Sequence, residues 1–296
     1  MPRRKKKIVA KLVGGLGNQI FIYFAALDLA RQHNRELILD FSFIERSHSD
    51  GNSRLDAFII EGFKVEYTGV RKSLKVFKEW ICDVLSVRGF DLFAKNFLDE
   101  KNLDTLASRP NSRTFTLRGF HSSAKHYESL GSPDLKLIKE SDKFRQLKLQ
   151  VSNCVAIHLR GGDFGLYSST FGPLSAEYYL KALSTNAAVK DLASRELINI
   201  FSDDRERSLK LRNFLEEKGF RIMEVSFEFI LTPAEELLLL SSAKSIIMAN
   251  STFSFWASEM SRQGTLIICP ENFTRSGEPV DFDSRKSRIF NKPEWE

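Results

Sequence analysis

The sequence is poor in cysteine and has none of the spacings by which cysteine or histidine side chains usually hold a metal. Its three cysteines, Cys82, Cys154 and Cys269, are far apart, and no C-x-x-C or H-x-x-x-H pair occurs. These absences argue against a disulfide framework, a zinc site and thiol redox chemistry, and we expect small buried side chains instead. The D-x-D at residues 281–283 follows the last strand that we expect, so we predict that no metal is required.

Long apolar runs are also missing. No run approaches the length needed to cross a bilayer, and the start MPRRKKKIVAKLVGG has no long apolar stretch followed by a small-residue cleavage site. We therefore expect a cytoplasmic protein.

Positive charge is concentrated at the N-terminus. The formal net charge is +6, and residues 3–7 alone supply five cationic side chains, so the rest of the chain is nearly neutral. A nearly neutral body argues against a nucleic-acid groove. The basic start predicts either a solvated terminus or peripheral contact with anionic lipid headgroups of a membrane.

The composition is that of a soluble globular protein, with 42% hydrophobic and 28% charged residues. A chain of 296 residues suits two domains, which we place at 1–150 and 151–296. The first domain opens with a strand, a helix and a second strand, at residues 7–13, about 18–33 and 36–41. Residues 42–150 contain few strand signals, and a helix is predicted over 72–87.

Strands and helices alternate regularly in the second half. The expected strands are 153–159, 196–202, 221–226, 245–249 and, as the last, 265–269; the expected helices are 175–189, 204–219, 232–244 and 251–264. The third of these helices starts with a capping box, in which Thr232 is the N-cap, Pro233 the first helical residue and Glu235 the reciprocal partner. This alternation predicts an α/β fold with a parallel sheet covered on both faces.

A glycine-rich turn, VGGLGNQIF at residues 13–21, joins the first strand to the first helix. Gly15-x-Gly17, with Asp40 ending the next strand, is compatible with a dinucleotide site of the nicotinamide type. Ile20 stands where that fingerprint would want its third glycine. A tight turn without a ligand is the other interpretation.

Ligands of such sheets bind outside the carboxyl ends of the strands, where the second half places three polar stretches. The first is HLRGGDF, residues 158–164. Arg160 could bind a phosphate with both arms of its guanidinium, and Asp163 could orient that arginine or start a helix. His158 could bond a phosphate or ribose, or be a satisfied half-buried histidine.

The other two stretches are SDDRE and NSTFS, at residues 202–206 and 250–254. Ser202, Asp203 and Asp204 could accept hydrogen bonds from a guanine edge or a ribose, or simply cap a helix. Asn250, Ser251, Thr252 and Ser254 form a helix start that suits a diphosphate, with simple capping as the alternative. Together the three stretches predict a nucleotide-diphosphate site.

Four motifs, GGLGNQIF, IHLRGGDF, FSDD and NSTFSFW, occur in this order along almost the whole chain. The sequence thereby resembles the inverting α-1,2-fucosyltransferases of glycosyltransferase family 11. This resemblance implies a GT-B-type fold with two Rossmann-like domains facing a cleft, an acceptor-facing domain at 1–150 and a GDP-fucose-binding domain at 151–296. It also implies metal-independent transfer, with inversion, to the 2-hydroxyl of a galactose-terminated glycan, including lipid-linked glycans of O-antigen biosynthesis.

The same resemblance implies roles for individual residues. Arg160 meets the β-phosphate, and Asp203 or Asp204 lies towards the nucleoside. Residues 251–254, which include Phe253, lie near the diphosphate. Asn18 reaches the donor across the cleft, in a donor-binding turn whose other members are Gly15, Gly17 and Gln19.

The chain departs from the family pattern at two positions: a second arginine is replaced by Gly161 and a tyrosine by Phe164. Unless its backbone requires a positive φ, Gly161→Arg is expected to tighten GDP binding. No carboxylate is an evident general base for the transfer, and the candidates are Asp163, Asp40 and His158. Two other functions remain open, a nicotinamide oxidoreductase built on Gly15, Gly17 and Asp40, and a non-catalytic sugar-nucleotide-binding protein.

Overall fold

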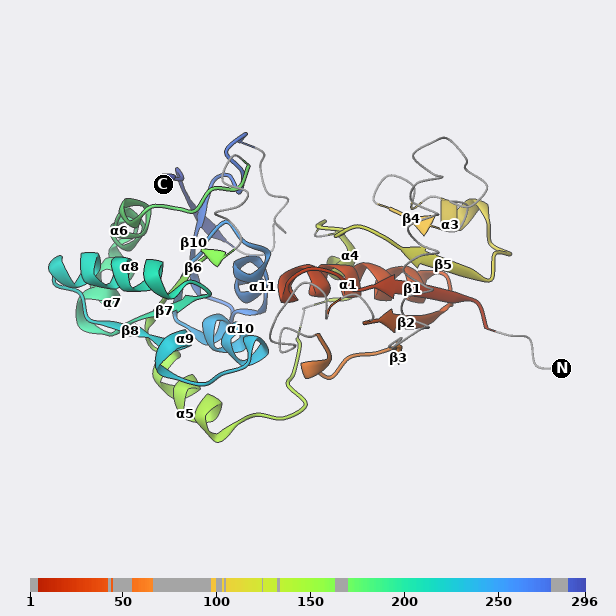
Figure 1. The fold of residues 1–296 in the computed structure, drawn as a ribbon, viewed down its shortest axis with the longest axis horizontal. Coiled ribbons are helices and arrows are strands. Elements are labelled where there is room, and N and C mark those ends of the chain that lie inside the picture. The colour runs from red at the N-terminus through yellow and green to blue at the C-terminus, as the bar shows by residue number, and fades with distance from the viewer. Residues whose placement is uncertain are drawn as a thin grey trace. The chain divides into compact units, whose positions relative to one another are not determined.

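The computed structural model describes residues 5–41, 44, 55–65, 97–99, 103, 105–123, 125–131, 134–162, 170–277 and 287–296. The chain divides into two compact units, Met1–Gly131 and Ser132–Glu296, each built around its own parallel sheet (Figure 1). We expected the second unit to begin at residue 151, but it begins at Ser132. It includes α5 (Asp142–Val151) because this helix packs against α10 (Pro233–Ser242).

The first unit contains a five-stranded sheet with the order β3-β2-β1-β5-β4. Its described elements are β1 (Lys7–Lys11), α1 (Leu16–Gln32), β2 (Glu36–Asp40), η2 (Leu55–Ala57), β3 (Phe63–Val65), β4 (Phe97–Leu98), α3 (Thr105–Ser108), β5 (Thr114–Leu117) and α4 (Lys125–Glu128). Every paired strand runs parallel to its neighbour.

The opening strand, helix and strand of this unit were predicted correctly. Their signals are local in the sequence: apolar residues alternate in β1 and β2, and α1 is a mainly apolar segment in which nearly all residues are buried. The strands β3, β4 and β5 were missed, because each has only two to four residues and therefore carries little periodicity. The helix predicted over 72–87 lies outside the described residues.

The second unit contains a six-stranded sheet with the order β11-β10-β9-β6-β7-β8. Its strands are β6 (Val155–Leu159), β7 (Ile198–Ser202), β8 (Ile222–Glu224), β9 (Ser245–Ile247), β10 (Leu266–Pro270) and β11 (Arg288–Asn291). Besides α5 and α10, its helices are α6 (Ala176–Thr185), α7 (Ala187–Arg195), α8 (Arg205–Glu217), α9 (Val225–Glu228) and α11 (Thr252–Met260).

The strand order of this unit is that of a doubly wound Rossmann-like sheet. The chain moves outward from β6 through β7 to β8, then crosses back and moves outward through β9, β10 and β11. The direction changes between β6 and β9, and ligands of such sheets bind outside the carboxyl ends at this switch point. All residues of β6 and β7 are buried, as strands covered on both faces require.

Most predicted elements of this unit are present, with three differences. The strand expected over 221–226 is β8, which ends at Glu224, and the residues that follow form the short helix α9. The expected helix over 175–189 is two helices, because Asn186 leaves the helical conformation and its side chain accepts the N–H groups of Ala188 and Val189 as the N-cap of α7. The strand over 265–269 is not the last, since β11 follows it. The edge strand β11 pairs on one side only and is half-exposed, so its sequence lacks the continuous apolar run of a buried strand. The capping box at Thr232 is confirmed.

Candidate functional site

The three polar stretches of the second unit meet at one edge of its sheet. They leave the carboxyl ends of β6, β7 and β9, which are neighbouring strands. His158 Nδ1 lies 2.6 Å from Ser254 Oγ, so the pair bridges the switch point between β6 and α11. On the other side of β6, the Gly161 N–H donates to Asp203 Oδ1 at 2.9 Å. The expected meeting of the three stretches at one edge of the sheet is confirmed, and their role as a donor site stays a prediction.

Arg160 is held in place by Asp203. The guanidinium forms an ion pair with Asp203 Oδ2, while the other carboxylate oxygen accepts the Gly161 N–H. The two side chains are 28% and 34% exposed, so the arginine is fixed by the protein and still open to a ligand. Asp203 thus acts as a positioning residue for Arg160, a role that the sequence interpretation did not include.

We expect Asp203→Asn to slow turnover by roughly tenfold, because Arg160 loses a partly exposed ion pair while Gly161 keeps its acceptor. GDP affinity should not fall in parallel, since the substitution also removes a negative charge near the position at which the diphosphate is expected. Steady-state kinetics and calorimetric GDP titration separate the two effects. Asp191→Asn, which breaks the exposed ion pair of Asp191 with Arg195 elsewhere in the same unit, is the matched control. An equal loss of GDP affinity and turnover in Asp203→Asn would place Asp203 on the nucleoside.

Asp204 and Ser202 serve the backbone. Asp204 is the N-cap of α8, where its Oδ1 accepts the Arg207 N–H at 3.1 Å. Ser202 is buried, and its Oγ accepts the Asp204 N–H at 3.0 Å. The contacts that the structure shows for these two side chains are therefore those of the capping interpretation. Their predicted contact with the donor stays a prediction.

His158 is enclosed on its side of the sheet. Its ring stacks on Phe253 with centroids 5.1 Å apart, and the Tyr179 hydroxyl donates to its carbonyl oxygen at 3.2 Å. Ser254 Oγ accepts the Ala249 N–H at 3.1 Å. The Ser254 hydroxyl proton then points to His158 Nδ1, the acceptor that the described part of the chain offers it. We therefore assign the ring proton to Nε2, which makes that nitrogen a hydrogen-bond donor.

Burial, and secondarily the nearby Arg160 charge, lowers the pKa of His158 to about 3. An imidazole with so low a pKa is a weak base, so His158 is better suited to donate a hydrogen bond than to remove a proton.

This low pKa predicts a dependence of stability on pH. The unfolded chain protonates His158 near pH 6.5 and the folded chain only near the lowered pKa of about 3, so stability falls as the pH drops through this window. Between about pH 7 and pH 5, the wild type should lose about 2 kcal/mol more unfolding free energy than His158→Gln. Urea denaturation at several pH values measures the difference. Parallel pH profiles for the two proteins would contradict a buried neutral His158.

The start of α11 combines a cap with a structural amide. Ser251 Oγ accepts the Phe253 N–H at 3.2 Å. The Asn250 side chain is buried, and its Nδ2 donates to the carbonyls of Phe171 and Gly172, and of Phe273 at 3.0 Å. Asn250 therefore holds neighbouring loops together at this edge. Thr252 and Phe253 are half-buried in the first turn of α11, where the helix dipole favours an anion, and Phe253 stacks on His158.

In the first unit, the glycine-rich turn is shaped by Gln19. This fully buried side chain donates from Nε2 to the Gly14 carbonyl at 2.9 Å, and its Oε1 accepts the Leu55 N–H at 3.0 Å. Both ends of the amide are therefore engaged by the protein. Any role of Gln19 in a donor site is to hold the shape of the turn.

The remaining predicted residues of this turn have different surroundings. Gly14 has a φ of 74°, and a Cβ there would lie 2.8 Å from Asn18 Nδ2, so glycine is required. Gly15 is the N-cap of α1, and a Cβ there would have no atom within 4 Å, whereas Gly17 is buried within the helix. Asn18 is half-buried. Donor contacts of Gly15, Gly17 and Asn18 stay predictions.

Two candidate bases are not part of the described cluster. Asp163 lies outside the described residues, as does the D-x-D at 281–283. Asp40 ends β2 of the first unit and is buried. Its carbonyl oxygen accepts the Leu12 N–H at 3.0 Å.

Sequence reasoning missed two residues that support the site. Arg207 donates to the carbonyl of Arg160 at 3.1 Å and pairs with Glu296 at 2.6 Å. Tyr179 holds the carbonyl of His158, as described above. The sequence offered no signal for either, because Arg207 resembles a solvated helix charge and Tyr179 a core aromatic.

Among the described residues, no group of three or more His, Cys, Asp or Glu side chains is placed to hold a metal ion. Cys154 and Cys269 are free and buried, as predicted, whereas Cys82 lies outside the described residues. In the same part of the chain, no helix combines the length and apolar character needed to span a membrane.

The family model of Glycosyl transferase family 11 matches residues 91–296, more than half of the chain. The chain belongs to this family. The family is therefore the one that the four motifs indicated, and its membership favours glycosyl transfer over the oxidoreductase alternative.

Two relatives come from Escherichia coli. An alpha-1,2-colitosyltransferase is 24% identical over 84% of this chain and 86% of its own length. The O-antigen biosynthesis glycosyltransferase WbnK is 25% identical over 88% of this chain and 93% of its own length.

Among solved structures, the fucosyltransferase NodZ from Bradyrhizobium has the same fold with a TM-score of 0.52. It is 11% identical, and the match covers 87% of this chain and 94% of that chain. NodZ has also been solved after soaking with GDP-fucose. The α/β, GT-B-type fold with two Rossmann-like units is thus confirmed.

Proposed function

We propose that this glycosyltransferase moves fucose from GDP-β-L-fucose to the 2-hydroxyl of a galactosyl acceptor glycan, with inversion and without a metal. The observation that carries the proposal is Arg160, a partly exposed cation fixed at the carboxyl end of β6, beside the switch point of a Rossmann-like sheet. A diphosphate leaving group gains negative charge as the sugar bond breaks, and a fixed guanidinium stabilises that charge.

The surroundings of Arg160 support a diphosphate at this position. The N-terminus of α11 favours an anion, and His158 Nε2–H adds a neutral donor beside it. The donor-binding residues that we propose are Gly15, Gly17, Asn18, Gln19, His158, Arg160, Ser202, Asp203, Asp204, Asn250, Ser251, Thr252, Phe253 and Ser254. Arg160, His158, Asn18 and Asp163 are the proposed catalytic group. Because the low pKa of His158 makes it a weak base, Asp163 and Asp40 remain the candidate general bases.

The acceptor is proposed to be a galactose-terminated glycan, in free or lipid-linked form. This assignment is tested by incubating the protein with GDP-fucose and a panel of such glycans, followed by NMR analysis of the product linkage. Formation of an α-1,2 linkage is expected. Release of GDP without any glycosylated product would mean that the acceptor class is wrong, and binding of GDP-fucose without GDP release would indicate a non-catalytic binding protein.

A second donor calls for a parallel assay, because one relative is named a colitosyltransferase. Colitose is fucose without its 3-hydroxyl group. Competition between the two GDP-linked sugars in a single reaction measures the ratio of their kcat/KM values. A preference for the deoxy sugar would change the donor while leaving the proposed diphosphate site intact.

We expect turnover to survive EDTA, because the proposed leaving-group stabilisation depends on Arg160 and on helix α11 rather than on a cation. Initial rates with and without chelator, measured at equal ionic strength, give the comparison. A loss of turnover that added Mg²⁺ or Mn²⁺ restores would disprove metal independence.

We also propose a cytoplasmic location with peripheral contact at the membrane. The basic residues at the start of the chain support this contact.

A further inference from the structure

The first unit has a second surface feature that the donor site does not use. A pocket of about 650 Å³ opens at the amino ends of its strands. Lys5 and Lys6 precede β1, Arg35 precedes β2, and Gly62 precedes β3. Since β1, β2 and β3 are parallel, this pocket lies at the opposite edge of the sheet from the glycine-rich turn.

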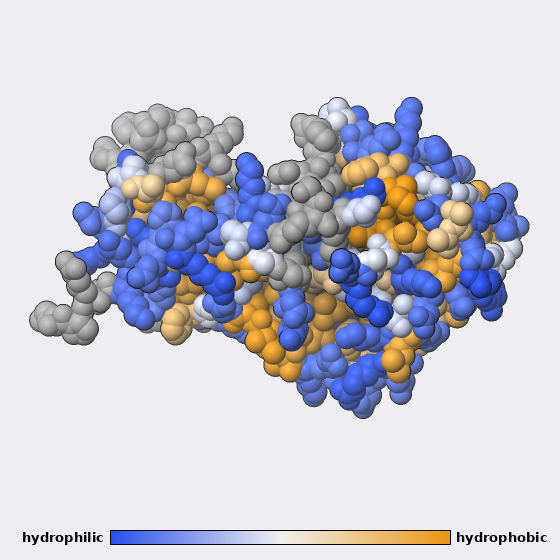
Figure 2. Space-filling view, turned by 180° about the vertical axis from the view of Figure 1, so that it is seen from behind, coloured by the Kyte–Doolittle hydropathy of each residue, from blue (hydrophilic) through white to orange (hydrophobic). Residues whose placement is uncertain are grey.

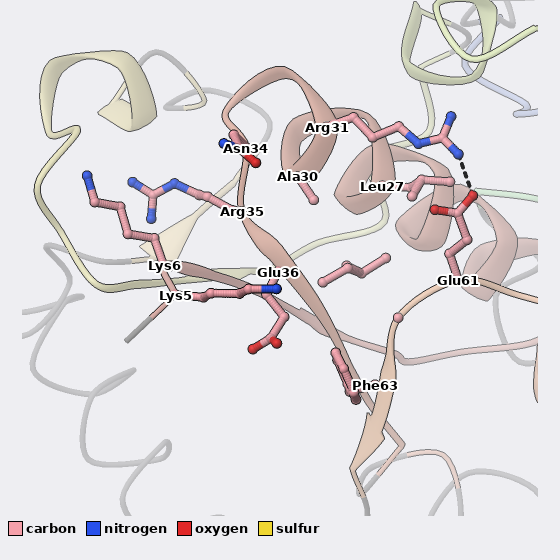
Figure 3. Close-up of a pocket in the computed structure, with 12 residues that line it drawn as sticks. Lys5, Lys6, Leu27, Ala30, Arg31, Asn34, Arg35, Glu36, Glu61 and Phe63 are labelled. Atoms are coloured by element: carbon pink, nitrogen blue, oxygen red, sulfur yellow. Dashed lines mark hydrogen bonds and ion pairs between the residues drawn. The ribbon is translucent and has the colours of Figure 1, made fainter. Parts of the chain in front are cut away.

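The pocket is lined by four cations and two carboxylates (Figure 3). Arg31 pairs with Glu61 across an exposed rim, and Glu36 pairs with Lys7 just outside the pocket at 3.2 Å. Lys5 and Lys6 form no ion pair among the described residues, so their charge is not neutralised locally.

Two of the lining cations, Lys6 and Arg35, donate hydrogen bonds to backbone carbonyl groups. Lys6 Nζ donates to the Pro110 carbonyl at 2.5 Å, and Arg35 donates to the Ser112 carbonyl at 2.9 Å. Carbonyl oxygens orient these side chains without cancelling their charge. The result is a fixed excess of positive charge. In the sequence, two more arginines precede it at positions 3 and 4.

Apolar side chains lie beside this charge. Phe63 lines the pocket and is 62% exposed, while Ile59, two residues before Glu61, is 65% exposed. Leu27 and Ala30 of α1 form part of the apolar lining (Figure 3). The end of this unit at the left of Figure 2 is mainly hydrophilic, with apolar residues showing between the polar ones.

We propose that this basic end of the first unit, formed by Lys5, Lys6, Arg31, Ile59 and Phe63, docks on the anionic phospholipid surface of a membrane. Phosphate-bearing headgroups complement the unneutralised cations, and the exposed apolar side chains enter the headgroup boundary. This inference gives the proposed peripheral contact a defined surface. Because the surface lies at the other edge of the sheet, docking leaves the glycine-rich turn free.

Vesicle flotation of the full chain tests the assignment. Wild-type protein should float with vesicles of phosphatidylcholine and phosphatidylglycerol, much less with phosphatidylcholine alone, and less at high salt. Lys5→Gln/Arg31→Gln should weaken binding to the anionic vesicles about 30-fold, at about 1 kcal/mol for each cation near the surface.

The chain offers a matched control for these charges. Lys190→Gln/Arg195→Gln in the second unit also removes two cations and breaks one exposed ion pair, that of Arg195 with Asp191. This control should bind like the wild type. Equal losses of vesicle binding in both double variants would mean that the protein is attracted by its general positive charge. Unchanged vesicle binding by Lys5→Gln/Arg31→Gln would mean that the rest of the N-terminal tail makes the attachment. Either result overturns the proposed surface.

The apolar part has its own control. Ile59→Ser should weaken flotation, whereas Ile138→Ser, at a position of similar exposure in the second unit, should not. Turnover of GDP-fucose with a soluble acceptor should stay unchanged in all four variants. Membrane binding and transfer are therefore measured separately, so a failure of this proposal is distinguishable from a failure of the proposed function.

Discussion

Arg160→Ala is expected to slow fucosyl transfer by about 10²- to 10³-fold, or roughly 3 kcal/mol of transition-state stabilisation. The arginine is held by Asp203 at the edge where the diphosphate is proposed to bind, so it needs no rearrangement when negative charge develops. GDP affinity should fall less than turnover, because the charge on the leaving group is larger in the transition state.

Single-turnover kinetics and GDP titration on the same preparation provide the two values. Arg160→Lys should resemble Arg160→Ala more than the wild type, since lysine keeps the charge but loses the planar pair of donors. Arg195→Ala, which removes an exposed arginine elsewhere in the unit, is the control for general loss of charge. Transfer by folded Arg160→Ala within a few-fold of the wild-type rate would show that the diphosphate is neutralised by another group.

Gly161→Arg is expected to destabilise the second unit and weaken GDP binding, which corrects the expectation drawn from the sequence. The φ of Gly161 is not in the left-handed region, so its backbone would accept a side chain. Space is the obstacle, because a Cβ at this position would overlap Asp204 Cβ and lie 2.5 Å from Asp204 Oδ2. Asp204 caps α8 and cannot move away without loosening that helix.

The same clash predicts an effect for the smallest substitution. Gly161→Ala should cost about 1–3 kcal/mol of unfolding free energy, the usual range for overpacking. Adding Asp204→Gly removes the overlapping Cβ at little capping cost, so the double variant should recover most of the loss. Urea denaturation of the two single variants and the double variant gives the coupling energy. Additive effects, or tighter GDP binding by Gly161→Arg, would rule out the steric explanation.

Much of the second unit was predictable because its signals are local. The alternation of buried strands with amphipathic helices reports the parallel sheet, and Thr232 with Glu235 specifies a helix start within four residues. The first unit was harder, since β3, β4 and β5 are too short to display a period. The position of the candidate site was inferred from a rule of topology, that ligands bind at the carboxyl ends of parallel strands.

The roles of neighbouring residues were not predictable in the same way. Asp203 and Asp204 are adjacent and chemically identical, yet one orients Arg160 and the other caps α8. The choice depends on which way each side chain leaves the end of β7, and on β6 lying next to it. Neither fact is encoded in local periodicity.

The sequence by itself determined the family, the alternating α/β architecture of the second unit and the three polar stretches of its candidate site, because these depend on short motifs and on the order of elements. Only the tertiary structure decided that His158 meets Ser254, that Asp203 holds Arg160, and that no side chain fits at Gly161. These contacts join residues far apart in the chain. They exist because the strand order brings β9, β6 and β7 side by side, and close packing there leaves one arrangement for each side chain.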